Sequence, residues 1–310
     1  MFRALRYALS GPSARKIHSS TVSRKSVVTE ATDKVRQGLA SAVEAGEKVT
    51  QSVKESMSSM GEQAKSKANE AAKDAKETTN KLADDANQIK RDAAGPSGIL
   101  LVRKCLESYS NATLVLYVRS PRKLPRDIVE NPAVVVIEGQ LDDIDAVARA
   151  LQGVEVVLSA LGPTGPIYPS DTPLGRGYSS IISVMQQQQV QRLICLGTAS
   201  IRDPSDRPSF KFGLIISGVR TLAYNAYKDM VAIGDAVRST DLDWTIVRVP
   251  FLTSGACVDV VAGYVGDGED SAFLSRAGFA GFVVSEIGKR EWIRKAPLVS
   301  LRAGKTNFYD

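Results

Sequence analysis

The stretch that decides the fold is Gly95-Pro96-Ser97-Gly98, which is followed at once by the apolar run 99–106. Two glycines three residues apart at the start of a helix form the second half of a dinucleotide-binding turn. There, backbone N–H groups at the helix N-terminus receive a pyrophosphate. A complete fingerprint also needs a third glycine upstream and a buried strand before it. Polar residues 88–94 stand there instead, so the motif alone favours an ordinary turn over a dinucleotide-binding turn.

Buried strands alternate with helices after Gly98. We predict strands at 113–118, 134–137, 154–158, 192–196 and 244–248, and helices at 144–151, 178–189 and 222–238. Continuous β-branched strands separated by helices are typical of a parallel sheet that is covered on both faces. The sequence therefore predicts an α/β domain over residues 95–310, with a Rossmann-like doubly wound parallel sheet.

The usual first strand of such a sheet is missing from its place before Gly95. That strand would lie at the centre of the sheet, between the strands expected at 113–118 and 154–158. Buried backbone groups without hydrogen-bond partners are costly. Either residues 86–94 fill the gap poorly, or the sheet is incomplete, and the junction near residue 95 resembles a fusion of two segments.

Residues 1–28 are basic, rich in serine and free of acidic residues, which is typical of a mitochondrial transit peptide. We expect delivery to the mitochondrial matrix, with a disordered basic tail as the alternative. No run approaches the roughly 20 apolar residues of a membrane-spanning helix. The leader also accounts for the whole net charge of +6, so a nucleic-acid partner is not implied; its basic residues are Arg3, Arg6, Arg15, Lys16, Arg24 and Lys25.

Residues 29–94 are rich in alanine, lysine and glutamate and repeat every eleven residues, as the column Ala42, Val53, Ala64, Ala75 and Ala86 shows. Eleven residues complete about three helical turns, so such a column runs nearly straight along a helix. The segment resembles late-embryogenesis-abundant repeats, which are stress-associated and largely disordered in water. We expect a long helix or a disordered arm with weak membrane-surface contact; a plain solvated spacer is the alternative.

The residue inventory limits the chemistry of the α/β domain. The single histidine, His18, lies in the leader, so histidine-based triads and zinc sites are excluded from that domain. The three cysteines lie in apolar runs without metal-ligand spacing, and we predict buried, reduced thiols and no metal site; they are Cys105, Cys195 and Cys257.

Arg119, Arg122 and Lys123 follow the strand expected at 113–118. Arginine can bind a phosphate through two parallel hydrogen bonds. No acid stands at the strand end to take a ribose 2′-hydroxyl in its place. The cluster therefore favours NADP over NAD, and a solvated basic loop is the alternative.

Tyr224 and Lys228 have the spacing Tyr-x-x-x-Lys, which places both on one helix face. An ammonium beside a phenol stabilises its phenolate and makes the phenol a usable proton donor near neutral pH. Ser200, just past the fourth strand, is the candidate third catalytic residue, which would orient a carbonyl. Thr198 is the alternative for this role. An ordinary pair on a helix surface is the alternative.

From Gly95 to about Ser300 the chain resembles the atypical short-chain dehydrogenase/reductase family, of the NmrA-like, NAD(P)H-binding type. The resemblance rests on the motifs at 95–98, 118–121, 138–142, 158–162 and 243–250, and it departs from the family where Gln140 replaces an aspartate. It gives Lys228 a second role, holding the nicotinamide ribose. The cofactor contacts it implies are Gly95, Ser97, Gly98, Arg119, Ser120, Lys123, Gln140, Leu141, Ser159, Ala160, Leu161, Gly162, Thr198 and Lys228.

These patterns predict an NADPH-dependent oxidoreductase of a small carbonyl or similar substrate, with Tyr224, Lys228 and Ser200 as its catalytic residues. Two other hypotheses remain open at this point. The domain could instead sense the redox state of NADP without catalysis, or the repeat segment could make the chain a stress-protective protein.

Overall fold

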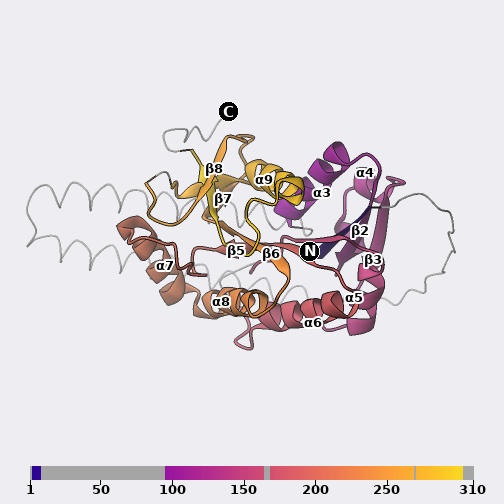
Figure 1. Cartoon of the computed structure of the whole chain (residues 1–310), viewed down its shortest axis with the longest axis horizontal. Coiled ribbons are helices and arrows are strands. Elements are labelled where there is room, and N and C mark those ends of the chain that lie inside the picture. The colour runs from indigo at the N-terminus through magenta and orange to yellow at the C-terminus, as the bar shows by residue number, and fades with distance from the viewer. Residues whose placement is uncertain (1, 8–94, 164–167, 269, 303–310) are drawn as a thin grey trace, which may run out of the picture. The chain divides into compact units, whose positions relative to one another are not determined.

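The computed structural model describes residues 2–7, 95–163, 168–268 and 270–302 of the 310-residue chain (Figure 1). The leader beyond Tyr7 and the repeat segment 29–94 lie outside the described residues. The boundary near residue 95 and the mitochondrial destination therefore stay predictions.

The described strands form one large sheet and one small one. The large sheet has the order β3-β2-β1-β4-β5-β6-β10-β8, and β7 pairs with β9 in the small one. All neighbours in the large sheet are parallel except β1 and β8, which run antiparallel to theirs. The strands are β1 Phe2–Tyr7, β2 Ala112–Val118, β3 Val134–Glu138, β4 Val156–Ser159, β5 Arg192–Thr198, β6 Asp243–Val249, β7 Phe251–Thr253, β8 Val260–Gly263, β9 Phe273–Ser275 and β10 Leu298–Leu301.

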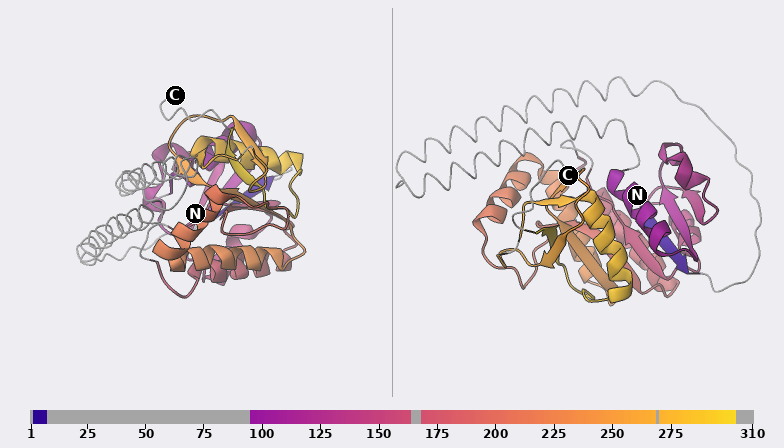
Figure 2. Two further views of the ribbon diagram at one scale, coloured as in Figure 1. Left: turned by 90° about the vertical axis from the view of Figure 1, so that its left-hand side faces the viewer. Right: turned by 90° about the horizontal axis from the view of Figure 1, so that it is seen from above.

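Helices cover both faces of the large sheet, as the predicted doubly wound fold requires. Helices α3 and α9 pack together on one face, whereas α5, α6 and α8 form a layer on the other (Figures 1 and 2). The helices are α3 Pro96–Ser108, α4 Arg126–Val129, α5 Ile144–Leu151, α6 Pro173–Gln187, α7 Phe210–Leu222, α8 Tyr224–Arg238 and α9 Arg276–Lys289, with a 3₁₀ turn η1 at Pro121–Lys123.

Strand β1 occupies the central position for which the sequence analysis expects a gap. It comes from the first residues of the chain and belongs to the same compact unit as the α/β domain. Phe2 pairs with Tyr117 of β2 and Ser159 of β4, and the register continues antiparallel along both neighbours. In the doubly wound fold the first strand is parallel because it leads directly into the glycine turn. Here residues 8–94 separate β1 from α3, so the turn does not impose that direction.

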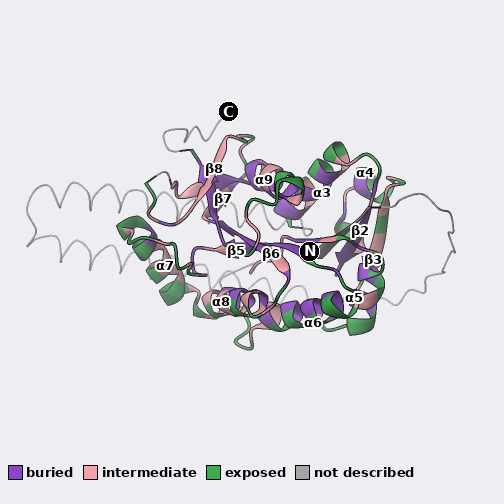
Figure 3. Cartoon of the chain, in the orientation of Figure 1, coloured by how far each residue is buried: buried purple, intermediate pink, exposed green. Residues whose placement is uncertain are grey.

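The core lies between the sheet and its two helix layers, where Figure 3 shows the strands mostly buried. Helix α5 shows how local sequence builds this arrangement. Its apolar positions recur at helical spacing and are buried: Ala146, Val147, Ala150 and Leu151. Asp143 begins the helix, because its carboxylate accepts a hydrogen bond from the Ala146 N–H at 2.9 Å.

Every strand and helix predicted after Gly98 is present, with ends shifted by a few residues. The helix predicted over 222–238 is α8, which begins two residues later at Tyr224, and α7, which ends at Leu222, was not predicted. Cys105 and Cys195 are buried free thiols as predicted, whereas Cys257 is only half-buried. Among the described helices, none has the length and apolar character needed to cross a membrane.

Candidate dinucleotide site

The predicted cofactor residues follow the carboxyl ends of four strands at one edge of the sheet. Strands β2 and β3 pair in parallel, as do β4 and β5, and β1 is antiparallel to both β2 and β4. All four strands therefore point the same way. Ligands of open α/β sheets bind at this carboxyl edge.

The glycine turn also reaches this edge. Helix α3 ends just before the amino end of β2, so its N-terminus lies at the opposite, carboxyl edge. Gly95 precedes the helix and accepts the Gly98 N–H at 2.8 Å. Pro96 has no N–H, which leaves the Ser97 N–H as the first-turn donor without an intrahelical acceptor. A Cβ added to Gly95 would meet no atom within 4 Å, so the turn faces open space.

Cations gather where β2 ends. Arg119, Arg122 and Lys123 are exposed, and Ser120 is half-buried. Glu138 lies opposite Val118 in the register, but none of the three cations forms an ion pair with any described acid. The described acids therefore leave this charge available to an anionic ligand.

The backbone after β3 is fastened to the end of β2. The buried Tyr117 hydroxyl donates to the Gln140 carbonyl at 2.6 Å, and the Gly139 N–H donates to the Val118 carbonyl at 3.1 Å. Burial, with Asp143 nearby, raises the pKa of Tyr117 to about 12, so this hydroxyl stays a donor. A Cβ on Gly139 would collide with the Tyr117 ring, which explains the glycine. The role of Tyr117 was not predicted from the sequence. Gly139 was the sequence feature that could have pointed to a large side chain packed against this loop.

Two predicted residues of this region differ in surroundings. The Gln140 side chain is exposed, whereas Leu141 packs toward α6, where a Cβ on Gly177 would overlap it. Leu141 thus closes the space between the loop after β3 and helix α6.

Ser159 ends β4, but its hydroxyl is already engaged within the protein. It is 2% exposed, and its Oγ accepts the Tyr178 hydroxyl at 2.6 Å and the Leu161 N–H at 3.4 Å. Burial raises the pKa of Tyr178 well above its ordinary value, so the phenol remains protonated. The structure therefore leaves Ala160, Leu161 and Gly162, rather than the Ser159 side chain, as the accessible part of this motif.

Thr198 ends β5 and carries the observation that bears most directly on a ligand. Its Oγ1 is buried and has no hydrogen-bond partner among the described residues. A buried polar group without a partner costs about 1–3 kcal/mol. A polar atom of a ligand at the carboxyl edge would satisfy this hydroxyl, so the site fits a dinucleotide. Ser200, two residues on, is 8% exposed.

Tyr224 and Lys228 lie on the first turns of α8, where Ala223 separates α7 from α8 with φ −139° and ψ 50°. Tyr224 is 56% exposed, and the Lys228 ammonium donates to the Ser170 carbonyl at 3.5 Å. Within the described part of the chain, no hydrogen bond joins either residue to Thr198 or Ser200. The structure thus keeps the Tyr-x-x-x-Lys pair on one helix face without assembling the predicted triad through direct contacts.

A buried ion pair that sequence reasoning missed holds the turn after Ser200 in place. Arg248 of β6 is fully buried and donates to Asp206 through Nη1 and Nη2 and to the Ile201 carbonyl. Asp206 also accepts the N–H groups of Asp203 and Val265. Burial alone would raise the pKa of Asp206, but the hydrogen bonds from Arg248 and the backbone outweigh it, so that pKa lies below its ordinary value.

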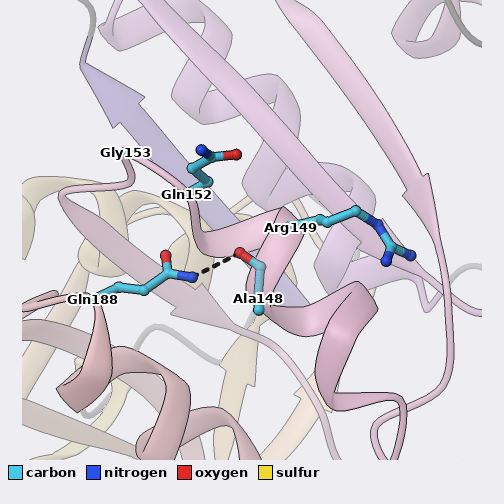
Figure 4. Close-up of a pocket in the computed structure, with 5 residues that line it drawn as sticks. All are labelled: Ala148, Arg149, Gln152, Gly153 and Gln188. Carbon is cyan, nitrogen blue, oxygen red and sulfur yellow. Dashed lines mark hydrogen bonds between the residues drawn. The ribbon is translucent and has the colours of Figure 1, made fainter.

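An open pocket of about 550 Å³ lies elsewhere, between the ends of α5 and α6 (Figure 4). Both helices end just before the amino ends of β4 and β5, so this pocket belongs to the opposite edge of the sheet. It is lined by Ala148, Arg149, Gln152, Gly153 and Gln188, none of which is a predicted site residue. In the described residues, no group of histidine, cysteine or acidic side chains could hold a metal ion.

The sequence profile of a family described as NAD(P)H-binding matches residues 93–290, well over half of the chain. The chain belongs to this NAD(P)H-binding family. No curated protein sequence matches it.

Solved structures share the fold of this NAD(P)H-binding chain. A short-chain dehydrogenase/reductase from Veillonella parvula, in complex with NADP, is 20% identical with a TM-score of 0.56, over 67% of this chain and 91% of that one. ChuY, an anaerobillin reductase from Escherichia coli O157:H7, is 15% identical with a TM-score of 0.54, over 67% and 93%. The oxidoreductase ylbE from Lactococcus lactis is 18% identical with a TM-score of 0.52, over 68% and 88%. At these identities the likeness shows the fold alone.

Proposed function

We propose that the protein is an NADPH-dependent oxidoreductase that reduces a small carbonyl or a similarly electron-poor compound. The observation that carries this proposal is a group of exposed cations at the end of β2 that form no ion pair with a described acid: Arg119, Arg122 and Lys123. A 2′-phosphate is the ligand that such a group fits, because charge-assisted hydrogen bonds to phosphate are strong. The Veillonella neighbour, which has the same fold and was solved in complex with NADP, supports this proposal.

Different residues of the carboxyl edge would bind different parts of the cofactor. Arg119, Ser120 and Lys123 would receive the 2′-phosphate, and Gln140 and Leu141 lie on the next loop of the same edge. The Ser97 N–H, at the start of α3 with Gly95 and Gly98, would meet the pyrophosphate. Ala160, Leu161 and Gly162 would lie beside the nicotinamide ribose, where the Thr198 hydroxyl would find the partner that the described residues do not supply.

The chemistry needs a proton as well as a hydride. NADPH, when bound, supplies the hydride. The exposed phenol of Tyr224 would donate the proton to the carbonyl oxygen, and the Lys228 ammonium would stabilise the phenolate that remains. Lys228 would also hold the nicotinamide ribose, and Ser200 would orient the carbonyl, with Thr198 as the alternative.

Cofactor titration of Arg119→Ala tests the proposal. One lost charge-assisted hydrogen bond contributes about 1.5–3 kcal/mol, so the affinity for NADPH should fall roughly ten- to a hundredfold. NADH has no 2′-phosphate, so its affinity should stay close to that of the wild type. Arg149→Ala is the matched control, because Arg149 is exposed at the opposite edge. Equal losses for both cofactors, or no binding of either to the wild type, would overturn the assignment.

One observation favours a second candidate, a non-catalytic module that senses the redox state of NADP. Tyr224 is 56% exposed and has no hydrogen bond to Thr198 or Ser200 in the described structure. A sensing module needs the cations of the carboxyl edge but not this phenol. The two candidates therefore differ in whether Tyr224 is required for NADPH oxidation.

A further inference from the structure

Helix α7 exposes a group of large apolar side chains. Eight large apolar side chains are exposed in the described structure, and four of them lie within α7 or shortly after its end. Phe210, at 75%, is the most exposed of the eight, and the other three are Leu214, Leu222 and Tyr224. We call these four side chains the α7 patch. Single exposed apolar residues are ordinary, but a group of them marks an interaction surface.

The side of α7 that faces away from the domain is open. Only one residue of the helix, Phe212, is buried, and it packs in a small apolar cluster with Val265. A Cβ added to Gly213 or Gly218 would meet no atom within 4 Å, and Figure 3 shows α7 mostly exposed. A surface helix normally turns a polar side outward. The α7 patch instead gives this helix an apolar exposed surface.

The charge around the α7 patch is positive. The stretch 207–228 contains no acidic residue and four basic ones, of which Lys228 is the last. Lys211 is paired with Asp270 at 3.0 Å. Arg207 and Arg220 are exposed, and neither forms an ion pair with an acid of the described chain. The surface therefore combines apolar side chains with two arginine charges that the described acids do not neutralise.

This combination of charge and apolar surface decides between possible occupants. A second copy of the chain, docked through the same helix, would bring the same arginines and no acid from the stretch 207–228 to pair with them. Like charges placed against each other weaken an interface. An anionic phospholipid surface complements both features, because its phosphates attract the arginines and its acyl chains accept the apolar side chains.

We propose that α7 docks the protein on the surface of a membrane that contains anionic phospholipids. Its 13 residues span about 20 Å, less than the roughly 30 Å of a bilayer core, so the helix would lie in the plane of the surface. The α7 patch would enter the boundary between headgroups and acyl chains, with Arg207 and Arg220 at the phosphates. This inference goes beyond the proposed function and does not depend on the cofactor.

Flotation of the full-length protein with lipid vesicles tests the proposal. Vesicles of phosphatidylcholine with about one-third phosphatidylserine should bind at least tenfold more protein than vesicles of phosphatidylcholine alone. The double variant Phe210→Ser, Leu214→Ser should bind the anionic vesicles at least tenfold more weakly, because it loses apolar burial. Val258→Ser is the matched control, since Val258 is 66% exposed outside α7, and it should bind like the wild type.

A charge reversal tests the electrostatic part separately. Arg220→Glu should weaken binding to anionic vesicles about tenfold or more, whereas Arg149→Glu, at the opposite edge of the sheet, should not. Equal binding to neutral and anionic vesicles would overturn the proposal. Unchanged binding of the α7 variants would also overturn it, because another segment would then hold the vesicles. So would a lipid-free dimer that the α7 variants abolish, because a second copy would then cover the helix.

Fluorescence locates the contact. The emission of Phe210→Trp, measured against the wild type, should be quenched by brominated phospholipids in anionic vesicles, because the indole would enter the acyl boundary. Val258→Trp should show no added quenching. The substituted side chains are exposed, so all variants should melt at the temperature of the wild type. Quenching of both tryptophans, or of neither, would contradict docking through α7.

Discussion

Arg248 and Asp206 form a two-pronged ion pair, with Nη1 2.6 Å from Oδ2 and Nη2 2.7 Å from Oδ1. The guanidinium is fully buried, and its Nε donates to the Ala296 carbonyl at 2.6 Å. The pair joins strand β6 to the turn that follows Ser200 and to the segment at Val265. Both the stability of the domain and the position of the turn after β5 depend on it.

Removing one partner of the Arg248–Asp206 pair should lower the free energy of unfolding, because the other charge stays buried. Asp206→Ala leaves Arg248 without its carboxylate, which destabilises a protein by about 3–5 kcal/mol. Urea unfolding at pH 7 measures this loss. Asp127→Ala is the matched control, because the Arg103–Asp127 pair is exposed on both sides and should contribute at most about 1 kcal/mol. Similar losses in the two variants would contradict the role of burial.

The same pair predicts how stability depends on pH. The pKa of Asp206 in the folded state lies below its ordinary value of 3.8. Its ionised form is therefore favoured by folding, and the stabilisation is fully present above that value and lost as the pH falls through the folded pKa. The difference in unfolding free energy between wild type and Asp206→Asn should be constant from pH 7 to about 5 and shrink below about 4. A constant difference down to pH 2 would show that charge is not involved.

Thr198→Val should separate stability from cofactor binding. The change removes a buried hydroxyl that has no partner in the described part of the chain, so the free protein should be as stable as the wild type or more stable. The affinity for NADPH should fall about tenfold if the hydroxyl meets the cofactor. Thr245→Val is the control, because the Thr245 hydroxyl bonds to Arg192 and to the Trp292 carbonyl and its loss should destabilise. Calorimetry and cofactor titration measure both quantities.

Tyr224→Phe tests proton donation. A positioned acid contributes roughly 10²–10⁴-fold, so NADPH oxidation over a carbonyl panel should fall by about that factor. NADPH binding should not change. Tyr227→Phe, three residues further along α8, should retain turnover. Full activity of Tyr224→Phe would contradict the catalytic role of Tyr224 and favour the non-catalytic sensing module.

Gly139→Ala should disturb the loop that follows β3. Its Cβ would collide with the Tyr117 ring, so the Tyr117–Gln140 hydrogen bond would have to break or the strand to shift. Overpacking of this kind costs about 1–3 kcal/mol. Gly213→Ala is the control, since open space surrounds that helical position and alanine should stabilise it by about 1 kcal/mol. Thermal melting of the two variants should therefore shift in opposite directions.

The three thiols should differ in reactivity. Cys105 and Cys195 are 1% exposed, and burial raises the pKa of Cys195 to about 12, so little reactive thiolate forms at pH 8. Cys257 is half-buried and should be alkylated first. Mass spectrometry after brief iodoacetamide treatment should find one modified cysteine in the native protein and three in urea. Early modification of Cys195 would contradict this order.

Local patterns in the sequence were sufficient for the parallel part of the sheet. Continuous apolar runs predicted β2 to β6, and α5 was predicted with the bounds that the structure has. Helix α7 was not predicted from the sequence. Its two glycines, Gly213 and Gly218, weaken the helical pattern of this segment.

Contacts between distant residues account for the rest. Arg248 was noticed as part of a motif, but its partner Asp206 is 42 positions away and nothing in the spacing links them. The hydrogen bond from the Tyr178 hydroxyl of α6 to Ser159 Oγ was not predicted either, because the two residues lie in different elements. The origin of the central strand was also out of reach, because Phe2–Tyr7 is short and contains two arginines.

The position of β1 makes the order of synthesis matter. The central strand is made before every other described strand, but Phe2 must wait for Tyr117 and then for Ser159 before both sides are paired. At about 5–20 residues per second, the second of these partners leaves the ribosome on the order of ten seconds later. Contacts so distant along the chain also form slowly. During synthesis the segment is therefore available to chaperones, and a growing chain cannot close its sheet in the order in which its strands appear.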